Sequence, residues 1–345
     1  MADGRITSSD QSLPGMIDVH SHYVPRDLPL GMDAAAGWPT LTVGESAAAL
    51  FIDGVEMRTL PSAAYDLTER WERVTRDGIT CQVLSPLPLL FRYSADVAEG
   101  ARFAEALNRD LKRAIDDSAG CFVGFGSLPM QSVDVAVEMV DLILELGFAG
   151  IEIGSNVNGV AVCDASFEPV FAAAAQSGLS VFVHASAPAY RRSLPNGPLG
   201  GAAGLPHEIA AVGGGLVVSG LIDRYPELRV LLSHGGGGLC TTLGRLDHAW
   251  RRTDRHTVTD DALAPTQVAQ RLYYDTVVYD ARVLELLVEV VGDRAVVLGS
   301  DFPAGNDRIG ATVLESDLAP DVKASICFDN ARRFLAIRQG VGIDG

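Results

Sequence analysis

The feature that most constrains this chain is a set of short apolar segments that each end in a histidine or an aspartate. The segments are rich in valine, leucine and isoleucine, which is typical of parallel strands buried on both faces of a sheet. The residues at their ends are His20, His22, His184, His234 and Asp301. Side chains two positions apart on a strand point the same way, so His20 and His22 can bind one ion together. One such histidine would usually be a core residue, but the repetition on four strands predicts a shared metal site.

Segments with strand character alternate with segments of helical periodicity along the chain. In 67–77, for example, Leu67, Trp71 and Val74 recur at helical spacing. The predicted strands cover 16–20, 80–84, 121–126, 150–153, 180–183, 229–233, 272–275 and 295–298, and the predicted helices cover 67–77, 97–118, 133–146, 167–176, 239–250 and 281–291. Eight such units predict an α/β fold, a (β/α)8 TIM barrel, with residues 1–345 as one domain. The carboxyl ends of its strands meet at one mouth, where the histidines and the aspartate should converge.

Two long segments interrupt this alternation. Residues 25–61 separate the first strand from its helix, and their glycine, proline and apolar residues predict a small inserted subdomain over the barrel mouth. Residues 185–204, with several prolines and a glycine-rich end, form a predicted long loop after the fifth strand. Both segments belong to the face on which barrel enzymes carry their chemistry.

The charge of the chain restricts its partners. A formal net charge of −17 repels phosphate backbones, so nucleic acid is not an expected partner. No run approaches about 18 uninterrupted apolar residues, which predicts no membrane span. Residues 1–14 lack the apolar segment of a signal peptide, and we expect a cytoplasmic protein. The cysteines lack a Cys-x-x-Cys pair and are expected to be reduced; they are Cys81, Cys121, Cys163, Cys240 and Cys327.

The expected donor set indicates the kind of ion. Neutral imidazoles and a carboxylate suit Zn²⁺ best, with Mn²⁺ or Fe²⁺ as alternatives. A catalytic ion keeps one coordination position open for water or substrate. His-x-His alone is a weak motif, but single histidines on strands five and six and a Ser-Asp pair on strand eight make the combination specific.

Four motifs together resemble a known family. They are Asp-Val-His-Ser-His at 18–22, Gly-Ile-Glu-Ile-Gly at 150–154, the His-Gly-Gly-Gly-Gly run at 234–238 with Leu-Gly-Arg at 243–245, and Leu-Gly-Ser-Asp-Phe-Pro at 298–303. From residue 16 to its end, the chain resembles the amidohydrolase superfamily, in the branch typified by 2-amino-3-carboxymuconate-6-semialdehyde decarboxylase. The run that begins at His234 and leads to Arg245 is more specific than His-x-His.

The resemblance implies roles for the histidines and the aspartate. In that family the ion is held by the residues that match His20, His22, His184 and Asp301. The residue that matches His234 is not a ligand and acts as an acid or base. We therefore expect His234 and Asp301 to be the catalytic residues.

The resemblance also implies how a substrate is held. The residues that match Arg58 and Arg245 bind the substrate carboxylate, and the second reaches across a dimer interface. Guanidinium groups suit this role because they bind a planar anion bidentately. We therefore expect a homodimer that acts on a small anionic substrate. On the residues alone, Arg58 and Arg245 could equally be solvated surface charges.

Three departures from the family pattern bear on the substrate. A tryptophan that usually follows the histidine of strand five is missing from 184–188, and Ala304 stands where an aromatic residue is common. Both changes reshape the pocket, so we expect a substrate other than the muconate semialdehyde. Glu152 replaces the usual glutamine. It faces the opposite way from Ile151 and Ile153, and a buried carboxylate must be paired or bound to metal.

Glu152 leaves two kinds of metal site open. It could bridge two ions between His184 and His234, or the site could hold one ion. The binuclear hydrolases of the superfamily use a carbamylated lysine on a barrel strand, but the two lysines of this chain, Lys112 and Lys323, lie on no predicted strand. The lysine-bridged subtype is therefore excluded.

The function that we expect is that of a metal-dependent, cofactor-free decarboxylase of a small unsaturated or aromatic carboxylic acid. His234 or Asp301 would exchange a proton with the substrate as CO2 leaves. The alternative is a hydrolase of an ester, thioester, lactone or amide in which Asp301 or His234 takes a proton from the attacking water, and Glu152 favours it. A scaffold without activity is disfavoured because the ligand set is intact.

Overall fold

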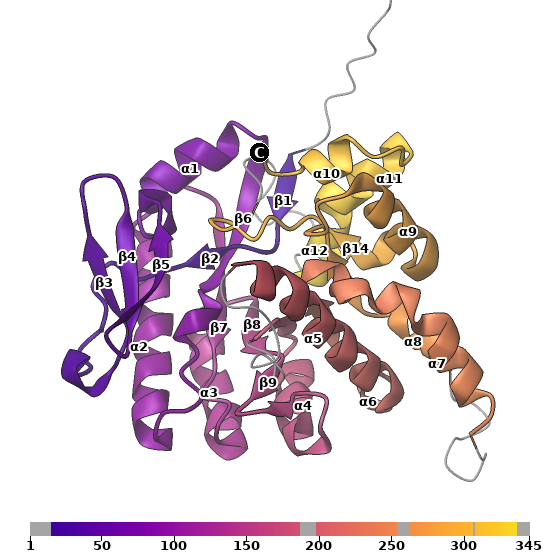
Figure 1. Ribbon diagram of the computed structural model, residues 1–345, viewed down its shortest axis with the longest axis horizontal. Helices are drawn as coiled ribbons and strands as arrows, with labels where there is room; N and C mark the ends of the chain where they lie inside the picture. The colour runs from indigo at the N-terminus through magenta and orange to yellow at the C-terminus, as the bar shows by residue number, and fades with distance from the viewer. Residues whose placement is uncertain (1–14, 187–197, 254–262, 306–307, 337–345) are drawn as a thin grey trace, which may run out of the picture.

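Eight parallel strands form a barrel in the computed structural model, which describes residues 15–186, 198–253, 263–305 and 308–336. Their spatial order follows the chain (Figure 1): β1 (Met16–Asp18), β6 (Ile79–Pro86), β7 (Phe122–Ser127), β8 (Gly150–Gly154), β11 (Ser180–His184), β12 (Arg229–Leu232), β13 (Tyr273–Asp275) and β14 (Val296–Val297). The first and last strands meet where the Val19 amide donates to the Leu298 carbonyl, at 2.9 Å, and where Ser21 forms a parallel bridge with Phe302. The predicted TIM barrel is confirmed.

Helices surround the barrel between successive strands (Figure 1). They are α1 (Leu67–Thr75), α2 (Val97–Asp116), α3 (Val133–Glu145), α4 (Glu168–Gln176), α5 (Pro198–Val218), α6 (Leu221–Arg224), α7 (Leu243–Trp250), α8 (Pro265–Ala269), α9 (Ala281–Val291), α10 (Ala311–Leu314), α11 (Pro320–Ala324) and α12 (Asn330–Phe334). The helix predicted at 281–291 matches α9. The loop predicted at 185–204 is shorter than expected, because α5 begins inside it; residues 187–197 lie outside the described residues.

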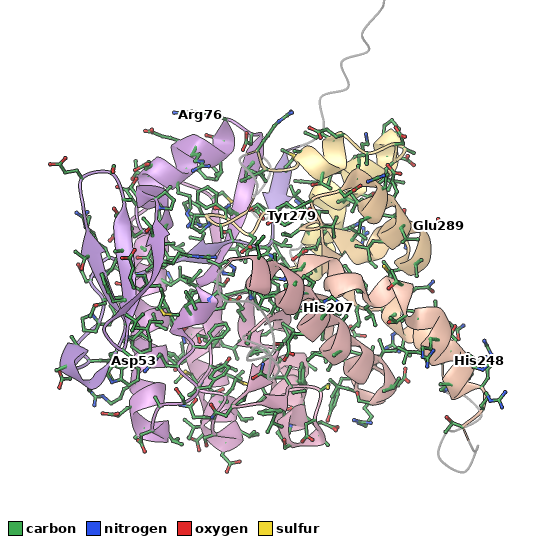
Figure 2. The ribbon with its side chains drawn as sticks, in the orientation of Figure 1. Asp53, Arg76, His207, His248, Tyr279 and Glu289 are labelled. Carbon is green, nitrogen blue, oxygen red and sulfur yellow. The ribbon has the colours of Figure 1, made fainter. Side chains whose placement is uncertain are left out.

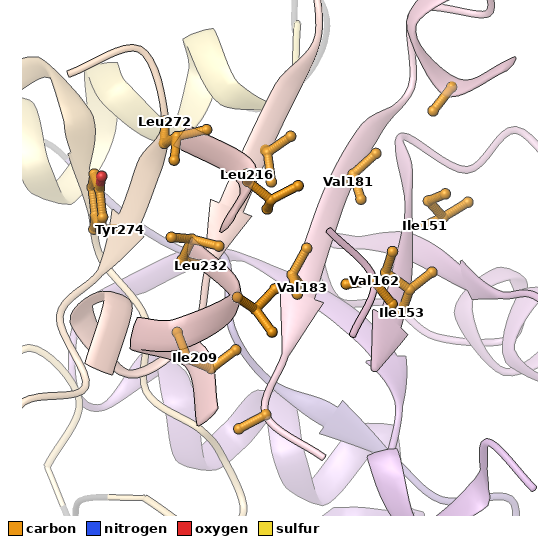
Figure 3. Close-up of a cluster of buried hydrophobic side chains, with 14 of the residues drawn as sticks. Ile151, Ile153, Val162, Val181, Val183, Ile209, Leu216, Leu232, Leu272 and Tyr274 are labelled. Carbon is orange, nitrogen blue, oxygen red and sulfur yellow. The ribbon is translucent and has the colours of Figure 1, made fainter. Parts of the chain in front are cut away.

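Strand residues alternate between two cores, as expected for strands that are buried on both sides. Ile151, Val181, Val183 and Leu232 face the surrounding helices (Figure 3), whereas Phe182 belongs to the separate cluster inside the barrel. The inner cluster also contains residues of α12 and the residue that caps it, among them Phe334 and Leu335. Glu152 lies between two residues that face outward, so its side chain points into the barrel, as the sequence predicted.

The segment predicted as an inserted subdomain, 25–61, contains a three-stranded antiparallel sheet. Its strands are β3 (Thr40–Val43), β4 (Ala48–Ile52) and β5 (Val55–Leu60). Leu50 and Leu60 of this sheet share a hydrophobic cluster with Phe103 and Leu107 of α2. The sheet therefore packs beside α2, at the left of the barrel in Figure 1.

Among the described helices, α5 has the length and apolar composition of a membrane span, over Leu199–Val218. Pro206, His207 and Glu208 interrupt its apolar sequence. Ile209 and Leu216 are fully buried in the main core, and the helix packs against the short η6 segment (His234–Thr241). These contacts are those of a core helix.

Candidate metal centre

Four side chains converge at the mouth of the barrel from three strand ends. His20 and His22 come from the end of β1 and the start of β2 (His22–Tyr23), His184 ends β11, and Asp301 follows β14. One ligand atom of each lies within 4.8 Å of the other three. Nε2 of His22 is 3.2 Å from Nε2 of His20 and 3.2 Å from Oδ1 of Asp301. The structure brings the predicted ligand residues together.

The orientation of His184 fits a bound cation. Its Nδ1 donates a hydrogen bond to the carbonyl of Ala185, at 2.9 Å, which leaves a lone pair on Nε2. That Nε2 is buried and has no hydrogen-bond partner among the described residues. A buried polar atom without a partner costs free energy, which a metal ion would recover. Three imidazoles and a carboxylate within this distance are the donor set of a catalytic divalent site.

The ionisation of the four groups differs. Burial lowers the pKa of His22 to about 4, and burial together with the charges of the other histidines holds that of His184 well below its usual value. Burial would raise the pKa of Asp301, but hydrogen bonds from His20 and His22 hold it well below its usual range. Burial would also lower the pKa of His20, but the carboxylates of Asp275 and Asp301 raise it to about 10. The cluster therefore offers two neutral imidazoles and an ionised carboxylate.

His234 lies beside this cluster. Its Nε2 is 4.0 Å from Oδ2 of Asp301, and its ring centre is 5.1 Å from that of His184. Burial lowers its pKa, and its Nδ1 has no hydrogen-bond partner among the described residues. A neutral, buried imidazole next to a metal site can give or take a proton.

The sequence analysis missed Asp275, which contacts both His20 and His234. Its carboxylate accepts a hydrogen bond from Nδ1 of His20 at 2.6 Å and from the amide of His234 at 2.9 Å. It also accepts from the amides of Gly235, at 2.8 Å, and Val277, at 3.0 Å. A signal was present, because a carboxylate ended the strand predicted at 272–275.

Asp18 connects the first and last strands below the cluster. It accepts hydrogen bonds from the hydroxyl of Ser300, at 2.6 Å, and from the side-chain amide of Gln82, at 2.7 Å. The amide of His20 also donates to Asp18, at 3.1 Å. The same carboxylate therefore orders the backbone next to His20 and next to Asp301.

The glycine run after His234 forms a left-handed turn. His234 and the four glycines Gly235 to Gly238 all have positive φ, between 56° and 90°. The sequence predicted a helix over 239–250, whereas the structure has this turn, the rest of η6, and then α7 from Leu243. Within this turn the amides of His234 and Gly235 both donate to the carboxylate of Asp275.

Glu152 lies on the other side of His22 from the cluster. Its Oε1 is 3.8 Å from Nδ1 of His22, whereas Nε2 of that ring faces Asp301. Neither carboxylate oxygen has a hydrogen-bond partner among the described residues. Burial raises its pKa to about 8, although the nearby hydroxyl of Ser85 opposes this. The ligand atoms that lie together do not include those of Glu152, and a bridge from Glu152 between two ions stays a hypothesis.

The two predicted substrate arginines lie outside the cluster in a single chain. Arg58 is exposed on β5 and Arg245 is exposed on α7. Partial burial and the charges of Asp301 and Asp275 raise the pKa of Tyr279 to about 12, and the charge of Arg58 opposes this. Tyr279, labelled in Figure 2, was missed by the sequence analysis; it is largely exposed and has a φ of 57°.

The remaining histidines are separate from this site. His207 on α5 and His248 on α7 are exposed (Figure 2). His256 lies outside the described residues.

Comparison with known proteins identifies similar chains. A family model described as amidohydrolase matches residues 17–337. A 2-amino-3-carboxymuconate-6-semialdehyde decarboxylase from Dictyostelium discoideum is 30% identical over 328 residues, which cover 93% of this chain and 91% of the relative.

Solved structures with the same fold include two decarboxylases. A 5-carboxyvanillate decarboxylase from Sphingomonas paucimobilis has a TM-score of 0.78 and 23% identity, covering 95% of this chain and all of the other. A dihydroxybenzoic acid decarboxylase from Polaromonas sp. JS666, solved with manganese bound, has a TM-score of 0.72 and 20% identity over 94% of this chain and 97% of the other.

Proposed function

We propose a function from the premise that this chain belongs to the amidohydrolase family, in the branch of 2-amino-3-carboxymuconate-6-semialdehyde decarboxylase. The protein is a metal-dependent decarboxylase of a small aromatic or unsaturated carboxylic acid. The observation that carries this function is the cluster of His20, His22, His184 and Asp301, in which the buried Nε2 of His184 has no partner among the described residues.

These four residues would hold one divalent cation. Three imidazoles and one carboxylate suit Zn²⁺, which we propose as the ion, and the manganese in the similar dihydroxybenzoic acid decarboxylase supports Mn²⁺ as the alternative. A bound divalent ion orients an anionic substrate and stabilises negative charge that develops on it.

The chain itself supplies the proton transfer. When the bond between carbon and the carboxylate breaks, CO2 leaves and the electron pair stays on the carbon, which then takes a proton. We assign His234 as the residue that delivers that proton, because its imidazole borders the cluster. The ring is neutral at pH 7, so it first takes a proton from water and, as the imidazolium, gives it to the carbon. Asp301 is ionised, and its Oδ2 lies 4.0 Å from Nε2 of His234. Its negative charge stabilises His234 when the imidazole takes up a proton.

We also propose that Arg58 and Arg245 bind the substrate carboxylate in a homodimer. Both guanidinium groups are exposed, so both are available to an anion or to a second chain. The net charge of −17 argues against nucleic acid as a partner. We also propose a cytoplasmic location, which the free cysteines support.

The direct test is CO2 release. Purified protein loaded with Zn²⁺ or Mn²⁺ should release one CO2 for each molecule converted from a panel of hydroxybenzoic, carboxyvanillic and unsaturated dicarboxylic acids. Metal analysis should find about one ion per chain, because four grouped ligands form one site. The matched control is His20→Ala, which should bind the metal far more weakly and lose the activity.

Glu152→Gln separates the decarboxylase from the hydrolase. Since Glu152 lies on the Nδ1 side of His22, the substitution should leave metal content near one per chain and preserve much of the turnover. Two ions per chain in the wild type, one in the variant, and products that contain an added water without CO2 would overturn the proposed decarboxylase.

A further inference from the structure

We propose that Asp275 is a positioning residue that sets the distance between the metal ligands and the acid–base residue. The inference rests on the proposed metal site, not on the identity of the substrate. Asp275 is fully buried at the end of β13, between the end of β1 and the turn that follows β12. It is not among the four grouped ligand residues.

The first contact orients a metal ligand. Nδ1 of His20 donates to Oδ2 of Asp275 at 2.6 Å, which turns Nε2 of the same ring toward His22 and Asp301, at 3.2 and 3.4 Å. In its neutral form an imidazole that donates from Nδ1 has its lone pair on Nε2, which is the atom that faces the cluster. The Asp275 carboxylate therefore selects the ring orientation and the tautomer that can bind an ion.

The second set of contacts anchors the acid–base residue. The same Oδ2 accepts the amide of His234, and Oδ1 accepts the amides of Gly235 and Val277. His234 has a φ of 56°, a left-handed conformation that a residue with a side chain adopts only when its surroundings hold it. Two of the hydrogen bonds that hold this turn thus end on the carboxylate that orients His20.

The surroundings of the Asp275 carboxylate are tightly packed and offer it only hydrogen-bond donors. A Cβ at Gly299 would lie 2.8 Å from the Cβ of Asp275 and 2.8 Å from the Cβ of His20. Only glycine therefore fits at this position, where the chain that follows β14 passes between the two residues. All four groups that face the two carboxylate oxygens are donors. An amide in place of the carboxylate must turn an NH2 group toward two of these donors, whichever way it is oriented.

The first experiment compares Asp275→Asn with Asp110→Asn. Asp110 is also a buried carboxylate, but its partners are Tyr23 and Arg113. Asp275→Asn should bind Zn²⁺ about 10- to 100-fold more weakly, as is typical when a residue that orients a ligand is lost. With saturating metal, its kcat should fall more than its KM changes, because His234 is displaced. Asp110→Asn should keep the metal affinity and the ratio of kcat to KM of the wild type.

A second measurement does not depend on any variant of Asp275. In the Zn²⁺-loaded wild type with ¹⁵N-labelled histidine, NMR should show the Nδ1–H of His20 as a strongly deshielded, exchange-protected proton. His20→Ala identifies this signal by removing it. In the His20→Ala background, Asp275→Asn should weaken residual metal binding little further, since its effect on affinity acts through that ring.

Three results would overturn the inference. The first is a folded Asp275→Asn variant with unchanged metal affinity, and the second is zinc bound to Nδ1 of His20. The third is that Asp275→Asn lowers metal affinity equally in the wild type and in the His20→Ala variant. If the wild type itself binds no divalent ion, the proposed metal site fails instead. If metal binding behaves as expected but no acid is decarboxylated, only the proposed function fails.

Discussion

At the scale of single residues, the candidate ligands differ in the protons that they carry. His22 and His184 are neutral at pH 7 because burial lowers the pKa of each. His20 is protonated, because the carboxylates of Asp275 and Asp301 raise its pKa to about 10 against the effect of burial. A divalent ion must therefore displace one proton from His20 when it binds.

This difference predicts that metal affinity depends on pH. Below a pKa of about 10, the proton on His20 competes with the ion, so affinity should rise about tenfold per pH unit between about pH 7 and 9 and level off above it. Calorimetry in buffers of different ionisation enthalpy should detect the release of about one proton per ion bound near pH 7. Metal binding without proton release would contradict the assigned ionisation of His20.

A second prediction at this scale concerns His234. His234→Ala should keep about one metal ion per chain and lose activity by about 10²- to 10⁴-fold, the range typical of a missing acid–base group. His207→Ala is the matched control, since it removes an exposed histidine of α5 and should change neither property. Loss of metal in step with activity would make His234 a ligand instead.

At the scale of the elements, the left-handed turn at His234–Gly238 depends on space as well as on backbone conformation. A Cβ at Gly237 would lie 1.8 Å from the carbonyl oxygen of Pro206 on α5. A Cβ at Gly238 would have nothing within 4 Å, although both glycines have positive φ. The turn and α5 are therefore in close backbone contact at Gly237.

This contact makes two glycine substitutions a matched pair. Gly238→Ala should cost about 1–2 kcal/mol of unfolding free energy, from the left-handed conformation alone. Gly237→Ala should cost about 1–3 kcal/mol more, because α5 or the turn must shift, and it should also lower activity by moving His234. Urea denaturation of both variants measures the difference. Equal unfolding free energies would show that α5 accommodates the methyl group without strain.

At the scale of the whole molecule, the two predicted substrate arginines belong to different sides of the chain. Arg58 lies on β5 and Arg245 on α7, and Figure 1 shows β5 at the left of the molecule and α7 at its lower right. One chain therefore does not bring both guanidinium groups to the same anion. A second chain could supply the missing arginine.

This separation leads to a test with mixed subunits. Arg58→Ala and Arg245→Ala should each lose most activity as separate homodimers. When the two are unfolded and refolded together, roughly a quarter of all sites should recover both arginines, because two-fold symmetry leaves one intact site in each mixed dimer. Refolding each variant alone is the control. Mixed dimers that stay inactive would contradict a shared site.

Much of the barrel could be predicted because its signals are local. Strand character and helical periodicity arise within about ten residues, and the helix predicted at 281–291 has the bounds of α9. The grouping of His20, His22, His184 and Asp301 followed from the rule that the strands of a barrel end at one mouth. Local patterns and this rule were therefore enough to predict the fold class and the residues of the metal cluster, and the four motifs indicated the family.

The surroundings of these residues follow from the tertiary fold. The hydrogen bond from His20 to Asp275 joins positions 255 residues apart, and no local pattern encodes such a pair. The side of His22 on which Glu152 lies depends on ring orientation, and the close contact between α5 and the glycine turn joins Pro206 to Gly237. Local periodicity specifies which face of a strand a side chain occupies, but the partners on that face are specified by how the strands close into a barrel.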